Sequence, residues 1–133
     1  MSLDFIALQA LVDDAPFHRW LGIRVLSSDA SGVALAADWR PEFSGHSVRD
    51  YVHGGILTSL MDLAGFYAVA AVHGTPRATA ALSIRFHRPV LAAALRVSAR
   101  ALERGPKNCT AEAQIWRVDG KLAASSEGDY SLS

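Results

Sequence analysis

The chain has 133 residues, half of them hydrophobic, and its 13 basic residues balance 13 acidic ones. This length predicts one domain, residues 1–133, with a buried core. The zero net charge supplies no basic surface for nonspecific nucleic-acid binding, so no nucleic-acid partner is expected. The single cysteine, Cys109, excludes a disulfide framework within the chain and fits a reducing cytoplasm, where we expect the protein to act.

The N-terminal residues predict a short helix that packs against the rest of the domain. Phe5, Leu8 and Val12 recur at helical spacing, up to a break at residues 13–16. The segment contains acidic residues and lacks the basic start of a secretory signal, so we do not expect a signal peptide. Residues 17–22 predict a second short turn or helix that leads into a sheet.

Two strands are predicted before the middle of the chain, over residues 23–28 and 32–39, with a hairpin turn between them. Val33, Leu35 and Ala37 alternate with small or polar neighbours, as in a half-buried strand. Four more strands are predicted after residue 77, separated by turn signals such as Asp119-Gly120, and they cover residues 78–88, 94–104, 109–118 and 121–132.

The segment from Gly54 to Val72 is apolar almost all round and carries one charge, Asp62. A helix of this kind must be wrapped by the rest of the protein, so Asp62 is expected where a carboxylate loses its water. A membrane span is disfavoured because an Asp at its centre costs roughly 2.5–3.5 kcal/mol on insertion scales, and nothing else in the chain could form a bundle. We therefore expect no membrane partner.

Two interpretations of Asp62 remain. A buried polar side chain is usually tied by a hydrogen bond and has only a structural role. A desolvated carboxylate can instead have a raised pKa and act as a general base or nucleophile near neutral pH. The pair Gly54-Gly55 favours chemistry, because two residues without Cβ let a ligand approach the bare N–H groups of a helix start.

The predicted order is two strands, one long helix and four more strands. This order cannot form a doubly wound fold, because only one helical connection separates the strands. The sequence therefore predicts an α+β protein, an antiparallel sheet of about six strands curled around the central helix. Such a sheet leaves an exposed edge. Pairing two edges across a two-fold axis would protect it, so we expect a homodimer.

The residues His53-Gly54-Gly55, with Asp62 nine positions after the histidine, resemble the signature of hotdog-fold acyl-CoA thioesterases of the phenylacetate-pathway (PaaI-like) type. Residues 79–89 are similar to the strand that follows the helix in this family, and Asp119-Gly120-Lys121 resembles its last hairpin. The resemblance covers roughly residues 15 to 131. It implies the hotdog fold, an acyl-CoA substrate, and a homodimer or a homotetramer built as a dimer of dimers.

The resemblance also implies a site at the dimer interface. The backbone N–H of Gly54, with Gly55 as a second donor, would polarise the thioester carbonyl. Asp62 of the other chain would activate a water or attack the acyl carbon itself, and the sequence leaves both roles open. Thr79 matches a position where the family often has a Ser or Thr that holds the water or Asp62. In a regular strand, however, Thr79 and Leu82 would point to opposite faces of the sheet, so Thr79 needs a bulge or a strand end to reach the site.

Four more residues are candidates for substrate binding. Ser47 stands where related thioesterases often have an asparagine, with His46 beside it, and Arg85 and Arg88 are candidates for the phosphates of coenzyme A. We expect His53 to orient its loop rather than transfer a proton. No cofactor is expected, because coenzyme A is part of the substrate. The histidines show no metal-ligand spacing, so no metal site is predicted.

The predicted function is hydrolysis of an acyl-CoA thioester to the free acid and CoA. The alternative from another class is a catalytically silent hotdog protein that binds acyl-CoA or another acyl ligand. A lyase or hydratase on the same fold is disfavoured, because Asp62 lacks the partner motif that such an enzyme would show. A serine hydrolase is disfavoured as well, because the chain has no G-x-S-x-G.

Overall fold

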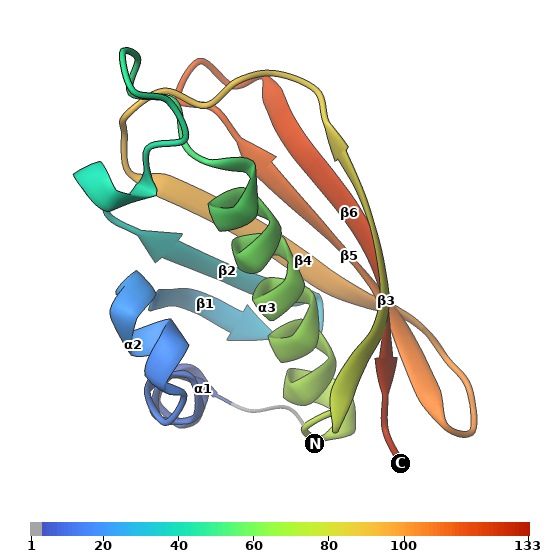
Figure 1. Ribbon diagram of the computed structural model, residues 1–133. Helices are drawn as coiled ribbons and strands as arrows, with labels where there is room; N and C mark the ends of the chain where they lie inside the picture. Colours follow the sequence, from blue (N-terminus) through green and yellow to red (C-terminus); the bar gives the residue numbers. More distant parts are fainter. Residues whose placement is uncertain (1–3) are drawn as a thin grey trace.

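The computed structural model describes residues 4–133 and shows a curved antiparallel sheet wrapped around one long helix (Figure 1). Two short helices, α1 (Phe5–Asp13) and α2 (Pro16–Leu21), precede the sheet, a 3-10 turn spans Pro41–Phe43, and the long helix is α3 (Gly54–His73). The six strands are β1 (Arg24–Asp29), β2 (Gly32–Ala37), β3 (Ala78–Phe86), β4 (Leu95–Arg104), β5 (Asn108–Trp116) and β6 (Leu122–Ser131). This is the α+β hotdog fold that the sequence predicted.

The strands follow the order β1-β2-β4-β5-β6-β3, and every neighbouring pair is antiparallel. Strand β3 follows α3 in the chain, pairs with β6 and forms one edge of the sheet. Within the described residues, the other side of β3 pairs with no strand. An edge of nine residues is a template for pairing with a second chain.

Helix α3 lies across the concave side of the sheet and contributes much of the core. Its buried side chains include Leu57, Leu60, Met61 and Ala64, and packing of this apolar face stabilises the helix more than its own propensity does. By length and composition α3 could cross a membrane, but 67% of its most apolar stretch is buried inside the fold.

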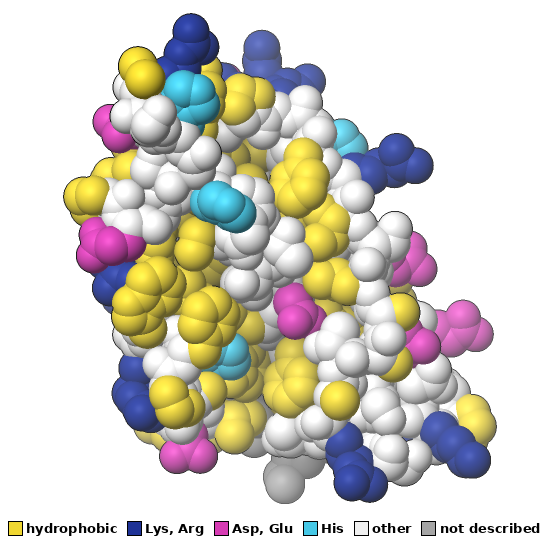
Figure 2. Space-filling view, in the orientation of Figure 1, with side chains coloured by type: hydrophobic (Ala, Val, Ile, Leu, Met, Phe, Trp, Pro, Cys, Tyr) yellow, Lys and Arg dark blue, Asp and Glu magenta, His cyan; other side chains and the backbone are white. Residues whose placement is uncertain are grey.

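One stripe of α3 is not covered by the chain. Gly55 is exposed, and Ser59, Asp62 and Phe66, which follow it at helical spacing, are only partly buried. The expectation that the rest of the chain wraps the helix on all sides is therefore wrong for a single chain, because the sheet curves around one side only. Figure 2 shows this open face, where hydrophobic side chains lie beside α3 and over the α1–α2 side.

Candidate active site

The start of α3 is held by His53, which caps the helix. Its Nδ1 accepts a hydrogen bond from the N–H of Gly55 at 2.7 Å, and its carbonyl accepts from the N–H groups of Ile56 and Leu57 at 2.9 and 3.2 Å. The N–H of His53 donates to the carbonyl of Phe43 at 2.7 Å. With Nδ1 as the acceptor, the proton of the neutral ring lies on Nε2.

The two glycines after His53 differ in what their N–H groups do. The N–H of Gly55 is occupied by the histidine ring, whereas the N–H of Gly54 has no acceptor within residues 4–133. The ring of Phe86 lies beside Gly54, since a Cβ built there would be 3.6 Å from its Cζ atom. Gly54 therefore offers the free donor, at the positive end of the helix dipole, where negative charge is favoured.

Asp62 lies two turns further along α3, on the open stripe, and its side chain is half-buried. Its Oδ1 accepts a hydrogen bond from Thr79 Oγ1 at 2.7 Å. In the part of the chain that the structure describes, Oδ2 has no hydrogen-bond partner. One carboxylate oxygen is thus fixed and the other is left for a ligand.

Thr79 reaches Asp62 because strand β3 contains a bulge. Thr79 is opposite Tyr130 and Leu82 is opposite Gly128, so three steps along β3 match two steps along β6. The extra residue turns Thr79 to the helix side of the sheet together with Leu82. The bulge that Thr79 needs to reach the helix side of the sheet is therefore present, between Thr79 and Ala81.

A second polar contact lies between α2 and α3. Nδ1 of His18 is 2.9 Å from the hydroxyl of Tyr67, and the two rings meet edge to face. Burial, together with the charge of Asp14, raises the pKa of Tyr67 to about 12, so its hydroxyl stays protonated. Burial lowers the pKa of His18, although the nearby Asp62 carboxylate opposes that shift. No local sequence pattern marks His18 as part of a site, because this contact spans 49 residues.

The loop before α3 folds on itself instead of reaching Asp62. Nδ1 of His46 accepts from the N–H groups of Val48 and Arg49, both at 3.1 Å. Ser47 is exposed in the same loop. The structure therefore does not bring these two substrate-binding candidates into contact with Asp62 within one chain.

The two candidate arginines lie apart from Asp62 as well. Arg85 lines a cavity of about 270 Å³ with Glu112 and Glu127 on the outer face of the sheet. Arg88 donates from Nη1 to the carbonyl of Leu122 at 2.7 Å. Neither contact brings a positive charge to the Asp62 carboxylate.

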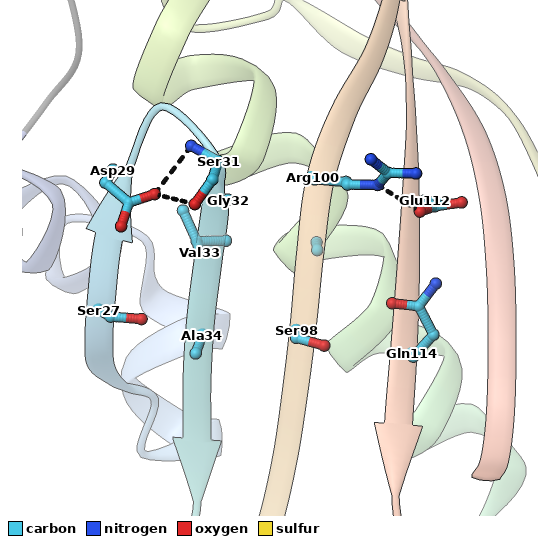
Figure 3. Close-up of a pocket in the computed structure, with 11 residues that line it drawn as sticks. Ser27, Asp29, Ser31, Gly32, Val33, Ala34, Ser98, Arg100, Glu112 and Gln114 are labelled. Atoms are coloured by element: carbon cyan, nitrogen blue, oxygen red, sulfur yellow. Dashed lines mark hydrogen bonds and ion pairs between the residues drawn. The ribbon is translucent and has the colours of Figure 1, made fainter.

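The outer face of the sheet carries a further cavity of about 300 Å³ (Figure 3). Residues of β1, β2, β4 and β5 and of the turn between β1 and β2 line it, and two of these residues, Arg100 and Glu112, form an ion pair. The sheet separates this face from α3, so the cavity is distinct from the surroundings of Asp62. Among residues 4–133, no three His, Cys, Asp or Glu side chains gather closely enough to hold a metal ion.

The six-stranded antiparallel sheet around one long central helix defines a hotdog-fold protein. A family model described as the thioesterase superfamily matches residues 50–124, more than half of the chain. The chain belongs to the thioesterase superfamily. This membership supports hydrolysis of a thioester as the general reaction.

Solved structures agree with this assignment. A protein from the thioesterase superfamily is 34% identical, with a TM-score of 0.92, and the match covers 97% of this chain and 98% of that one. A phenylacetic acid degradation-related protein from Ralstonia eutropha JMP134 is 26% identical over 94% of this chain and 98% of its own, with a TM-score of 0.80. The PaaI protein of E. coli, from the phenylacetic acid degradation operon, is 24% identical over 93% of this chain and 88% of its own, with a TM-score of 0.78, and shows likeness of fold. The predicted resemblance to hotdog thioesterases of the PaaI-like type is confirmed.

Proposed function

We propose that this protein hydrolyses an acyl-CoA thioester to the free acid and CoA. In this proposal the N–H of Gly54 polarises the thioester carbonyl, and Asp62 acts as the general base or the nucleophile. One observation carries it: α3 begins with a free N–H, at Gly54, and carries a half-buried carboxylate with one free oxygen, Asp62, on its uncovered stripe.

Gly54 and Asp62 of one chain cannot act on the same thioester. Eight residues separate them on α3, which corresponds to about 12 Å along a helix. The carbonyl oxygen that Gly54 would bind and the carbonyl carbon that Asp62 would approach are directly bonded to each other, so both groups must reach the same small region. The proposal therefore requires that one of the two groups comes from a second copy of the chain.

The free edge of β3 supplies a geometry for that second copy. Phe86, at one end of β3, lies beside Gly54, and Thr79, at the other end, is bonded to Asp62. If two β3 strands pair antiparallel about a two-fold axis near Leu82 and Ser83, the middle of the strand, Phe86 of one chain comes opposite Thr79 of the other. Gly54 of each chain then approaches Asp62 of its partner. We propose a homodimer, alone or within a dimer of dimers, as the active assembly.

The chemistry follows from these positions. As a general base, Asp62 would take a proton from water through Oδ2 while the water oxygen attacks the acyl carbon. As a nucleophile, Asp62 would form an acyl-carboxylate anhydride that water then cleaves. In both cases negative charge grows on the carbonyl oxygen beside Gly54 N–H, and the tetrahedral intermediate collapses by releasing the CoA thiolate. A preorganised donor of this kind is commonly worth a few kcal/mol.

A thiol-release assay with a panel of aryl- and alkyl-CoA thioesters tests the function. We expect CoA to be released from at least one of them far faster than in buffer alone. Equilibrium binding of the same thioesters, measured in parallel, detects the alternative function. Tight binding without thiol release from any thioester would favour a non-catalytic acyl-CoA-binding protein.

A pair of substitutions at Gly54 tests the proposed donor. Gly54→Pro removes the N–H at the first helical residue, where proline is well tolerated, and His53 already has an extended ψ of 136° that suits the residue before a proline. We expect kcat to fall about 10²-fold or more. Gly54→Ala keeps the N–H, and its Cβ would meet Phe86 at an ordinary 3.6 Å.

Steady-state kinetics and thermal denaturation of both variants distinguish a lost donor from a lost fold. Gly54→Ala keeps the donor and should lose much less activity than Gly54→Pro. Equal losses of activity in the two variants would show that the space beside Phe86 matters and the N–H does not.

A further inference from the structure

Asp62 is held at two points by one cross-strand pair. Thr79 on β3 and Tyr130 on β6 are directly opposite each other in the sheet. Thr79 Oγ1 donates to the carboxylate of Asp62 at 2.7 Å, and the hydroxyl of Tyr130 donates to the backbone carbonyl of the same residue at 3.0 Å. The side chain and the main chain of Asp62 are therefore fixed by neighbouring residues.

The Tyr130 ring occupies a slot that two glycines make. A Cβ at Gly65, on the turn of α3 after Asp62, would lie 2.3 Å from the Tyr130 hydroxyl, and one at Gly128 would lie 2.7 Å from the ring. A larger residue at either position would have to displace the ring. Tyr130 is 1% exposed, and burial together with the Asp62 carboxylate raises its pKa, so the phenol remains a donor.

The Tyr130 hydrogen bond is not needed to complete the helix. The carbonyl of Asp62 lies in the middle of α3, where the helix itself supplies an N–H four residues later. The phenol is thus an additional donor, directed at the one turn of α3 that carries the proposed catalytic group. A buried tyrosine hydroxyl usually finds an acceptor, and here that acceptor belongs to the residue that carries the proposed catalytic carboxylate.

We infer that Tyr130 is a positioning residue for Asp62 and that, with Thr79, it aims the free carboxylate oxygen at the open face of α3. This inference rests on the proposed thioester hydrolysis. Tyr130 touches neither the thioester nor the water. It acts by holding the helix turn of Asp62 at a fixed distance from the bulge in β3.

The test is Tyr130→Phe, which removes one oxygen and keeps the ring in its slot. With the thioester of the panel that the wild type hydrolyses fastest, we expect kcat to fall about tenfold and KM to change less than about twofold. Thr79→Val should have a similar effect. The double variant should fall well short of the roughly hundredfold loss that two independent effects would give, because both act through Asp62.

Two further variants separate positioning from packing. Cys109→Ala loosens the same buried cluster, which contains Tyr130, Val69 and Ala111, without removing the hydroxyl, so it should lower the melting temperature and leave kcat within about twofold. Gly65→Ala forces the hydroxyl away from the carbonyl while improving helix propensity. It should reproduce the loss of kcat even if Tyr130→Phe folds poorly.

The outcomes distinguish this inference from the proposed function. If Asp62→Asn is inactive while Tyr130→Phe melts earlier but keeps the wild-type kcat, Tyr130 has a packing role and the inference is wrong. Unchanged kcat in Gly65→Ala would have the same meaning. If Asp62→Asn itself keeps full activity, the proposed function is wrong, whatever Tyr130 does.

Discussion

Asp62→Asn should lower kcat/KM by about 10²-fold or more, the usual cost of losing a general base or a nucleophile. The amide has the same shape as the carboxylate, and its oxygen can still accept the hydrogen bond of Thr79 Oγ1. It cannot take a proton from water, and it is a poor nucleophile. Thiol release under saturating and limiting substrate, with a melting curve to verify folding, measures the effect.

Asp38→Asn is a matched control for this substitution. Asp38 pairs with Arg24 at 2.9 Å on the surface, where their side chains are 73% and 51% exposed. Exposed ion pairs contribute little to stability, so the control should keep wild-type activity and nearly the wild-type melting temperature. If Asp62→Asn also stayed within about threefold of wild type, Asp62 would not be the catalytic carboxylate, and its bond to Thr79 would have a structural role only.

The fold could be predicted because its signals are local. Breaks such as Arg88-Pro89 and Asp119-Gly120 separate segments whose apolar patterns fit strands. The observed strands begin and end within two residues of the predicted ones. The number and order of elements then leave few ways to cover one apolar helix. The sequence pattern was less informative about how much of α3 its own chain covers. An apolar helix face can be buried by the same chain or by a second copy, and the pattern is the same in both cases.

The arrangement of the candidate site depends on contacts between distant residues. The alternation of side chains along a strand showed that Thr79 needs a bulge to reach the helix side. The bulge itself is set by the pairing with β6, about 50 residues later in the chain. The bond from Tyr130 to Asp62 spans 68 residues, and no local pattern marks it. The difference between Gly54 and Gly55 depends on the orientation of the His53 ring, which the motif alone does not specify.

A mixture of two inactive variants should regain activity if each site is shared between two chains. In a dimer of one Asp62→Asn chain and one Gly54→Pro chain, one site combines the intact Gly54 of the first chain with the intact Asp62 of the second. The other site carries both defects. Random pairing of the two chains at equal amounts gives about half mixed dimers, so about a quarter of the wild-type activity should return.

Co-expression of differently tagged chains, followed by purification of the mixed dimer, makes the measurement direct. The mixed dimer should have about half of the wild-type activity per dimer, because one of its two sites is intact. Each variant alone should stay near 1% or below, given losses of about 10²-fold. If Gly54 and Asp62 acted within one chain, every site in the mixture would contain one defect, and the mixed dimer would be as inactive as its parents. That result would contradict the shared site and would require a rearrangement of α3, since about 12 Å of helix separates the two groups.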